Sequence, residues 1–361
     1  MARHIENIKE LIKKLNIDGI LIKSKTTKKY LDTLEGSGVQ LLITKGNAYA
    51  IMDGRYVLEA MEEEHNFIII ENTPAQSNKS HFDIIYNIFK EEKYSKLGIE
   101  SSGYSIEDYQ RLNKYDFEVS LVKEEINEVR IIKDQLEIEI IKEACNITDN
   151  IFSELLKHIK VGISENEINA WLHYYALNAG ASKLSFNPVI TSGPRTALPH
   201  GRPTERKVQA HEPIMIDFGI EYKKYQSDMT RMVFIGEPSK EIVKIYNVVQ
   251  KAQQAGVEAI KEGVKANYVD SIVRSIIDEA GYGEKFSHGL GHGIGIGDGS
   301  EYPFLNQTSQ TILKNNMIMS CEPGIYIQGL GGIRIEDDVL ISNGIGVPLN
   351  RTTKEMIILE E

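Results

Sequence analysis

Five residues in the C-terminal part of the chain are of types that bind metal ions. Four are carboxylates and one is an imidazole: Asp217 in MIDFG, Asp228 in QSDMTR, His292 in GLGHGIG, Glu322 in SCEPGIY and Glu336 in IRIEDD. Hard or borderline divalent ions prefer such an oxygen-rich set, which suits a single structural zinc badly. Two ions held close together are a recurring device for hydrolysis, because a water shared between them becomes a hydroxide near neutral pH. The residue types therefore predict a site for two divalent ions.

The segments around the two aspartates support this prediction. Both lie in apolar stretches that predict neighbouring antiparallel strands, so the carboxylates of Asp217 and Asp228 would lie side by side. Buried like charges repel one another and lose their hydration unless a cation lies between them. The alternative is that Asp217 caps a turn and Asp228 pairs with Arg231.

The run SHGLGHGIGIGDG has the wrong glycine spacing for a nucleotide-binding loop. If the run is extended, its glycines leave one face open to a close backbone or ligand, and His292 lies on the other face. A hydrogen-bonded core histidine is the alternative for His292. Glu322 and Glu336 lie in apolar strands, where a carboxylate needs a partner. For Glu336 that partner could instead be Arg334.

A further imidazole, His200, stands between two prolines in ALPHGRP. The prolines stiffen the backbone, and a stiffly held imidazole can donate to a developing oxyanion or contact a substrate amide. The alternative is a histidine in a surface turn.

Hydrophobic patterns predict the elements that must position these residues. Short apolar runs alternate with helical stretches up to about residue 121, which is typical of a small α/β domain with a mixed sheet. The second part combines long helices with strands and glycine turns, and we place the domains at residues 1–124 and 125–361. Ser164 and Glu167 have the spacing of a capping box. Helical patterns cover residues 4–15, 81–92, 106–114, 123–159, 164–179, 239–262 and 266–280.

Composition excludes several classes of protein. The net charge of −11 and the pI near 5.5 argue against nucleic acid as a main partner. Two cysteines are too few for a disulfide framework. The N-terminal residues lack the apolar core of a signal peptide, and no uninterrupted apolar stretch is long enough to span a membrane. These features predict a soluble, cytoplasmic protein.

Together the segments resemble the metallopeptidase family of methionine aminopeptidases, proline-specific aminopeptidases and prolidases, which share the pita-bread fold. DGRY at 53–56 and RIIKD at 130–134 resemble the two-domain, proline-specific branch. SFNPVITSG, ALPHGRP, MIDFG, SDMTR, GHGIG, CEPGIY and RIEDD then follow in the family's order. The resemblance implies an α+β protein, with a pita-bread C-terminal domain after a smaller α/β domain with a mixed sheet.

The resemblance also implies roles for the residues. Asp217 would chelate one metal, Asp228 and Glu336 would bridge both, and His292 and Glu322 would complete the other. A bridging hydroxide would attack the scissile carbonyl, Glu322 would shuttle a proton to the leaving amine, and His200 would steady the intermediate. Manganese is the leading candidate, with cobalt, iron and zinc open. A small peptide substrate and a homodimer are implied too. Further substrate contacts are expected from Phe186, Tyr302 and Arg334, and support of the ligands from His288 and Thr230.

One departure from the family pattern concerns the substrate. These peptidases usually carry a second histidine seven positions after the ligand histidine, where this chain has Gly299. Tyr302 is nearby in sequence and could supply a substitute hydroxyl. The first interpretation is a peptidase that cleaves before proline. The alternatives are a metal-dependent hydrolase of a small non-peptide amide and a non-catalytic binding protein on the same fold.

Overall fold

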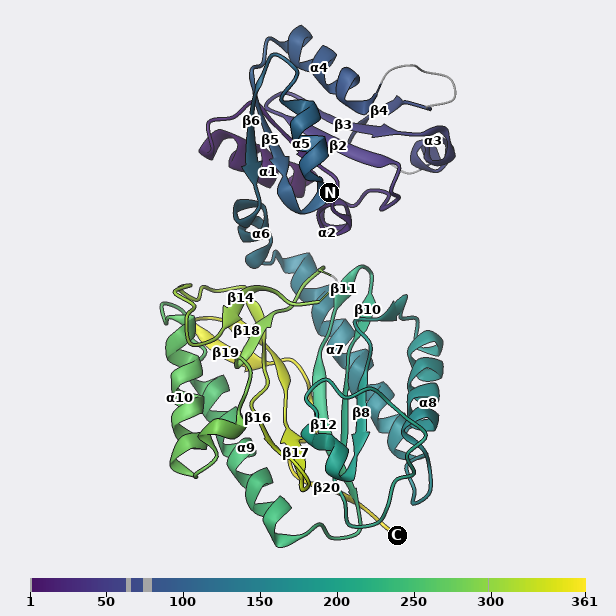
Figure 1. Ribbon diagram of the computed structural model, residues 1–361, viewed down its shortest axis with the longest axis vertical. Helices are drawn as coiled ribbons and strands as arrows, with labels where there is room; N and C mark the ends of the chain where they lie inside the picture. Colours follow the sequence, from purple (N-terminus) through teal and green to yellow (C-terminus); the bar gives the residue numbers. More distant parts are fainter. Residues whose placement is uncertain (1, 63–65, 74–79, 298) are drawn as a thin grey trace. The chain divides into compact units, whose positions relative to one another are not determined.

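The computed structural model describes residues 2–62, 66–73, 80–297 and 299–361 (Figure 1). Contacts divide the chain into an N-terminal unit, Met1–Arg130, and a C-terminal unit, Ile131–Glu361. The boundary predicted between residues 124 and 125 falls at the start of helix α6 (Glu124–Ile131). Within the described ranges, no helix is both long and apolar enough to cross a membrane.

The N-terminal unit is built on a mixed sheet with the strand order β4-β3-β2-β1-β5-β6. Strands β1–β2 and β2–β3 pair antiparallel, whereas β3–β4, β1–β5 and β5–β6 pair parallel. Helix α1 buries Ile8 and Ile12 completely, as its helical spacing of apolar residues predicts. The strands are β1 (Gly19–Ile22), β2 (Val39–Thr44), β3 (Ala48–Met52), β4 (Ile68–Glu71), β5 (Lys96–Glu100) and β6 (Glu118–Val122). The helices are α1 (Ala2–Lys14), α2 (Lys25–Tyr30), α3 (Gly54–Glu62), α4 (His81–Glu92) and α5 (Ile106–Leu112), with the short η1 (Ser101–Gly103) and α6.

The C-terminal unit places its strands between two pairs of long helices, α7 with α8 and α9 with α10 (Figure 1). One hydrophobic core lies under α7 and α8 and the other under α9 and α10. The helices are α7 (Gln135–Leu156), α8 (Glu165–Asn178), α9 (Lys240–Ala259) and α10 (Ala266–Glu279), with the short η2 (Gly193–Ala197) and η3 (Gly283–Lys285). The two helix pairs around a strand layer are the pita-bread arrangement that the family resemblance implies.

The strands of this unit form several sheets. Their orders are β11-β10-β7, β20-β12-β9-β8, β14-β13-β15-β18-β19 and the hairpin β16-β17. The first strands are β7 (Lys183–Leu184), β8 (Val189–Ser192), β9 (Ile214–Phe218), β10 (Ile220–Tyr222), β11 (Tyr225–Gln226) and β12 (Met229–Ile235). The others are β13 (Gly291–Gly293), β14 (Glu301–Leu305), β15 (Ile318–Cys321), β16 (Gly324–Ile327), β17 (Gly331–Arg334), β18 (Asp337–Ser342), β19 (Ile345–Pro348) and β20 (Ile357–Leu359).

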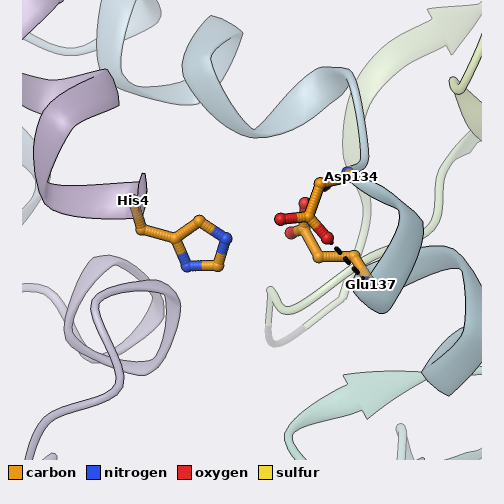
Figure 2. Close-up of side chains that lie close together, drawn as sticks. All are labelled: His4, Asp134 and Glu137. Carbon is orange, nitrogen blue, oxygen red and sulfur yellow. Dashed lines mark hydrogen bonds between the residues drawn. The ribbon is translucent and has the colours of Figure 1, made fainter. Parts of the chain in front are cut away.

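The helical pattern over 123–159 is not one helix but two, α6 and α7, and in this respect the prediction was wrong. Ile132 forms an isolated bridge with Met317, which takes the backbone out of the helix. Asp134 then caps α7 in a capping box with Glu137, drawn in Figure 2. The His4 side chain in the same figure belongs to the N-terminal unit, where its Nδ1 lies 2.6 Å from the carbonyl oxygen of Tyr30. The capping box predicted at Ser164 and Glu167 is present at the start of α8.

Candidate metal centre

Strands β9 and β12 bring the two aspartates together. They pair antiparallel, as predicted, with Asp217 opposite Thr230. Along β9, Met215 belongs to the core under α9 and α10, and Ile216 belongs to the core under α7 and α8. Because side chains alternate along a strand, Asp217 points to the same side as Met215. Arg231 pairs with Asp337 at 2.6 Å, so the alternative pairing of Asp228 with Arg231 is wrong.

Three carboxylates meet in the interior of the unit. Asp217, Asp228 and Glu336 are all buried, and each offers an oxygen within 4.8 Å of the other two. Burial raises the pKa of all three carboxyl groups. For Asp217, the positive charge of Arg334 partly offsets this increase in pKa. The next cause is repulsion from the other carboxylates, Glu336 acting most on Asp228 and Glu322 most on Glu336. Such a cluster is unfavourable as a set of bare anions.

His292 and Glu322 approach the cluster from β13 and the end of β15. The Nε2 atom of His292 lies 3.7 Å from Oδ2 of Asp228 and 3.6 Å from Oε1 of Glu322. Ser320 holds both residues, because its Oγ accepts from the backbone N–H of His292 and donates to Glu322. The five predicted ligands therefore converge in one region.

Alternating glycines allow the strand of His292 to fit between its neighbours. A Cβ atom at Gly291 would lie 2.1 Å from the carbonyl oxygen of Ser320, and one at Gly293 would lie 2.0 Å from that of Tyr302. These positions accept only glycine, because the backbones of β15 and β14 occupy the space. The regular strand is shorter than the run suggests, covering only Gly291–Gly293.

Arg334 is bound to Asp217 rather than to Glu336, which corrects the alternative weighed for Glu336. Its Nη2 donates to Asp217, its Nε donates to Thr230, and its Nη1 donates to Tyr326 and to the Pro199 carbonyl oxygen. The Tyr326 hydroxyl also lies 2.9 Å from Nε2 of His288. A chain of hydrogen bonds thus runs from His288 to Asp217. Burial lowers the pKa of His288, which favours its neutral form.

Glu336 and its two neighbours in RIEDD have different partners. Glu336 accepts a hydrogen bond from the Thr230 hydroxyl, as expected of a residue that supports a ligand. Asp337 points away and binds Arg231 and Lys354. Asp338 accepts from the backbone N–H of Asp228 at 2.8 Å, and burial raises its pKa to about 8. No local sequence pattern indicates the roles of Asp338 and Tyr326, because both depend on contacts between distant strands.

A cavity of about 540 Å³ opens over the carboxylate cluster and includes all five predicted ligands in its lining. His200, Phe186 and Arg334 line it, together with His288. Gly299 and Ser300 line it too, so the position without the second histidine faces the cavity. Tyr302 lies outside the described lining. Its ring packs edge-on against Phe304, which does line the cavity.

Two observations indicate that these residues are suited to binding divalent ions. Oδ1 of Asp217 and Oδ1 of Asp228 are buried and, among the described atoms, have no hydrogen-bond partner. Buried carboxylate oxygens are normally satisfied, so these two have the environment of metal ligands. The donor set is also predominantly carboxylate oxygen, which suits magnesium-, manganese- or iron-type ions better than a structural zinc.

Comparisons with known proteins agree with this geometry. The model of metallopeptidase family M24 matches residues 139–343, and that of the creatinase/prolidase N-terminal domain matches residues 4–132. An Xaa-Pro dipeptidase of Pyrococcus furiosus is 36% identical over 359 residues, covering 99% of this chain and 100% of the relative.

Solved structures show the same similarity along the whole chain. An Xaa-Pro dipeptidase from Bacillus anthracis superposes with a TM-score of 0.92 at 35% identity, covering 99% of both chains. An X-Pro aminopeptidase from Thermotoga maritima gives a TM-score of 0.87 at 32% identity, covering 96% of this chain and 99% of the other. The chain therefore belongs to metallopeptidase family M24 and carries the N-terminal domain of its creatinase and prolidase members.

Proposed function

We propose that this metallopeptidase hydrolyses the peptide bond that precedes proline, with two divalent ions held by Asp217, Asp228, His292, Glu322 and Glu336. The observation that carries the proposal is the convergence of the three buried carboxylates within 4.8 Å, with two oxygens that lack a protein partner. The Xaa-Pro substrate is supported by the relatives, which are named for that activity and match along the whole chain. Manganese is the proposed native metal.

When bound, the ions would supply Lewis-acid chemistry, polarising the scissile carbonyl and lowering the pKa of a water. The chain's own residues would orient the substrate and move the proton. Glu322 is partly exposed in the cavity and is held by Ser320, so it can carry a proton between the water and the leaving amine. His200 is exposed in the same cavity and can donate to the carbonyl oxygen as negative charge develops there. Phe186 gives the cavity an apolar wall suited to a proline ring.

Arg334 would act through Asp217 rather than on the substrate. Its guanidinium is buried, and the hydrogen bonds to Asp217, Thr230 and Tyr326 fix its position. A guanidinium at this place keeps the Asp217 carboxylate ionised and oriented. A carboxylate must be both in order to bind a metal ion. Tyr326 and His288 extend this support.

The test is hydrolysis of a panel of substrates by enzyme reconstituted with manganese. The panel contains Xaa-Pro dipeptides, longer Xaa-Pro peptides and peptides that begin with methionine, with cobalt, iron and zinc compared in parallel. Glu322→Gln is the low-activity control. The substitution removes both a proposed metal ligand and the proposed proton carrier, and should lower kcat by at least about 10²-fold. No turnover of any Xaa-Pro substrate by enzyme with two ions per chain would refute the proposal and favour a small non-peptide amide.

We propose a cytoplasmic homodimer. Its two cysteines, Cys145 and Cys321, are both free and buried, as in a reducing compartment. Light scattering after gel filtration measures the mass in solution, and a mass of 40.7 kDa would show a monomer instead.

A further inference from the structure

The connection between β8 and β9, which contains His200, carries a guanidinium that differs from the neighbouring cations in lacking an ionic partner. Three other cations of this connection are paired: Arg195 with Glu165, Arg206 with Glu212 and Lys207 with Glu167. Arg202 is exposed and lines the cavity above the carboxylate cluster. Its side chain makes one long hydrogen bond, from Nη1 to the Asn187 carbonyl oxygen at 3.4 Å. No carboxylate of the described ranges lies within ion-pair distance of it.

Arg334, the other arginine of the described cavity lining, is not available to bind an anionic ligand. Arg334 is buried, and each of its three nitrogens already donates to a protein oxygen. Any anionic ligand that approached it would have to displace the Asp217 carboxylate. Arg202, in contrast, can turn its guanidinium to a ligand without breaking an ion pair. The cavity thus has carboxylates at its base and, on its wall, one arginine that forms no ion pair with a described residue.

We infer that Arg202 binds the C-terminal carboxylate of a dipeptide substrate and so selects dipeptides over longer peptides. The inference rests on the proposed function, in which the scissile carbonyl lies at the carboxylate cluster. In an Xaa-Pro dipeptide the free carboxylate belongs to the residue directly after the scissile bond. One residue spans at most about 3.3–3.6 Å, so its receptor must line the same cavity as the metal ligands. Arg202 meets that requirement.

The chemistry of the two groups also matches. A guanidinium offers two parallel N–H donors that fit the two oxygens of a carboxylate, a geometry that an ammonium does not reproduce. A longer peptide would place a neutral amide at this position and move its carboxylate away by about 3.3–3.6 Å for each added residue. The guanidinium would then lose its charged partner, and discrimination would follow from that loss.

The test compares Ala-Pro with its amide, Ala-Pro-NH₂, which differs only in the terminal charge. The Arg202→Met variant should lower kcat/KM for Ala-Pro by about 10- to 100-fold, the range for hydrogen bonds to a charged group, mainly through KM. The same variant should change kcat/KM for the amide by less than about twofold. Arg202→Lys keeps the charge without the planar pair of donors, and should fall between the wild type and Arg202→Met on Ala-Pro.

Lys207→Met is the matched control, because it removes a positive charge from the same connection outside the cavity lining. It should leave both substrates unchanged, and all variants should keep the wild-type melting temperature and metal content. Equal losses on Ala-Pro and its amide would overturn the inference, as would a wild-type enzyme with no preference for the free carboxylate. If the metal-loaded wild type cleaves no Xaa-Pro substrate, the proposed function itself fails, an outcome distinct from either of these.

Discussion

Replacing Asp228 by asparagine should stabilise the metal-free protein while abolishing its metal binding. Asp228 offers an oxygen within 4.8 Å of oxygens of Asp217 and Glu336, and two unit charges at that separation repel by about 3.5 kcal/mol at an effective dielectric constant near 20. The metal-free site relieves part of this repulsion by taking up protons, in line with the raised pKa values. We therefore expect the free energy of unfolding to rise by about 1–3 kcal/mol.

The substitution removes charge and little else. Oδ1 of Asp228 is buried without a hydrogen-bond partner, and Oδ2 lies 3.7 Å from His292, beyond hydrogen-bond distance. The backbone N–H of residue 228 keeps its hydrogen bond to Asp338 in the variant. Asparagine has almost the same shape as aspartate, so no cavity forms.

Urea unfolding after treatment with a chelator measures the free energy, and elemental analysis after reconstitution measures bound metal. Asp270→Asn is the control, for which we expect the free energy of unfolding to change in the opposite direction. Asp270 is also buried, but it pairs with Arg274 through two hydrogen bonds, so its neutralisation should destabilise the protein by about 3 kcal/mol. A metal-free Asp228→Asn protein that is less stable than the wild type would refute the reasoning. So would a variant that still binds two ions per chain.

Three further predictions concern pH, the support of Asp217 and the backbone at residue 299. The folded pKa values of Asp217, Asp228 and Glu336 lie above their unfolded values, so the folded state binds more protons and the unfolding free energy of metal-free protein should fall as pH rises from about 4. Urea titrations from pH 5 to 8 should show this slope, and a slope in Asp228→Asn as steep as in the wild type would contradict the assignment. Tyr326→Phe removes the hydroxyl that accepts from Arg334 at 2.8 Å and should lower the unfolding free energy by about 1–2 kcal/mol, whereas an unchanged urea midpoint would show that the hydroxyl contributes nothing. Gly299 has a φ of +108° with open space around it, so Gly299→Ala should cost about 1 kcal/mol through backbone strain alone, and a gain in melting temperature would argue against that strain.

The parts of the fold that the sequence predicted are those set by local patterns. The helix over residues 4–15 follows from apolar spacing, because the spacing itself determines which face can be buried. The capping box of Ser164 and Glu167 involves residues three apart, so no distant contact is needed to form it. The antiparallel pairing of β9 with β12, which brings Asp217 and Asp228 together, also involves segments close in sequence, since only the small hairpin of β10 and β11 separates the two strands.

The parts that the sequence could not predict depend on contacts between distant segments. The division of 123–159 into two helices follows from the bridge between Ile132 and Met317, which lie far apart in the chain. The arginines show the same limit. Sequence proximity suggested Arg231 as the partner of Asp228 and Arg334 as the partner of Glu336. The structure pairs Arg231 with Asp337 and Arg334 with Asp217, because the packing of strands selects partners across more than a hundred residues.

The charges of the site explain why two ions suit it better than one. Asp217, Asp228, Glu322 and Glu336 bring four negative charges, and Arg334 offsets one through its bond to Asp217. A single dication would leave one negative charge uncompensated in a buried region, which is costly. Two dications would leave one positive charge, which a single anionic ligand at the cavity can neutralise. Without ions, the remaining way to remove the repulsion is to bind protons, as the raised pKa values indicate. Ions and protons therefore compete for the same oxygens, so the affinity for metal should rise with pH over the range in which these carboxyl groups ionise.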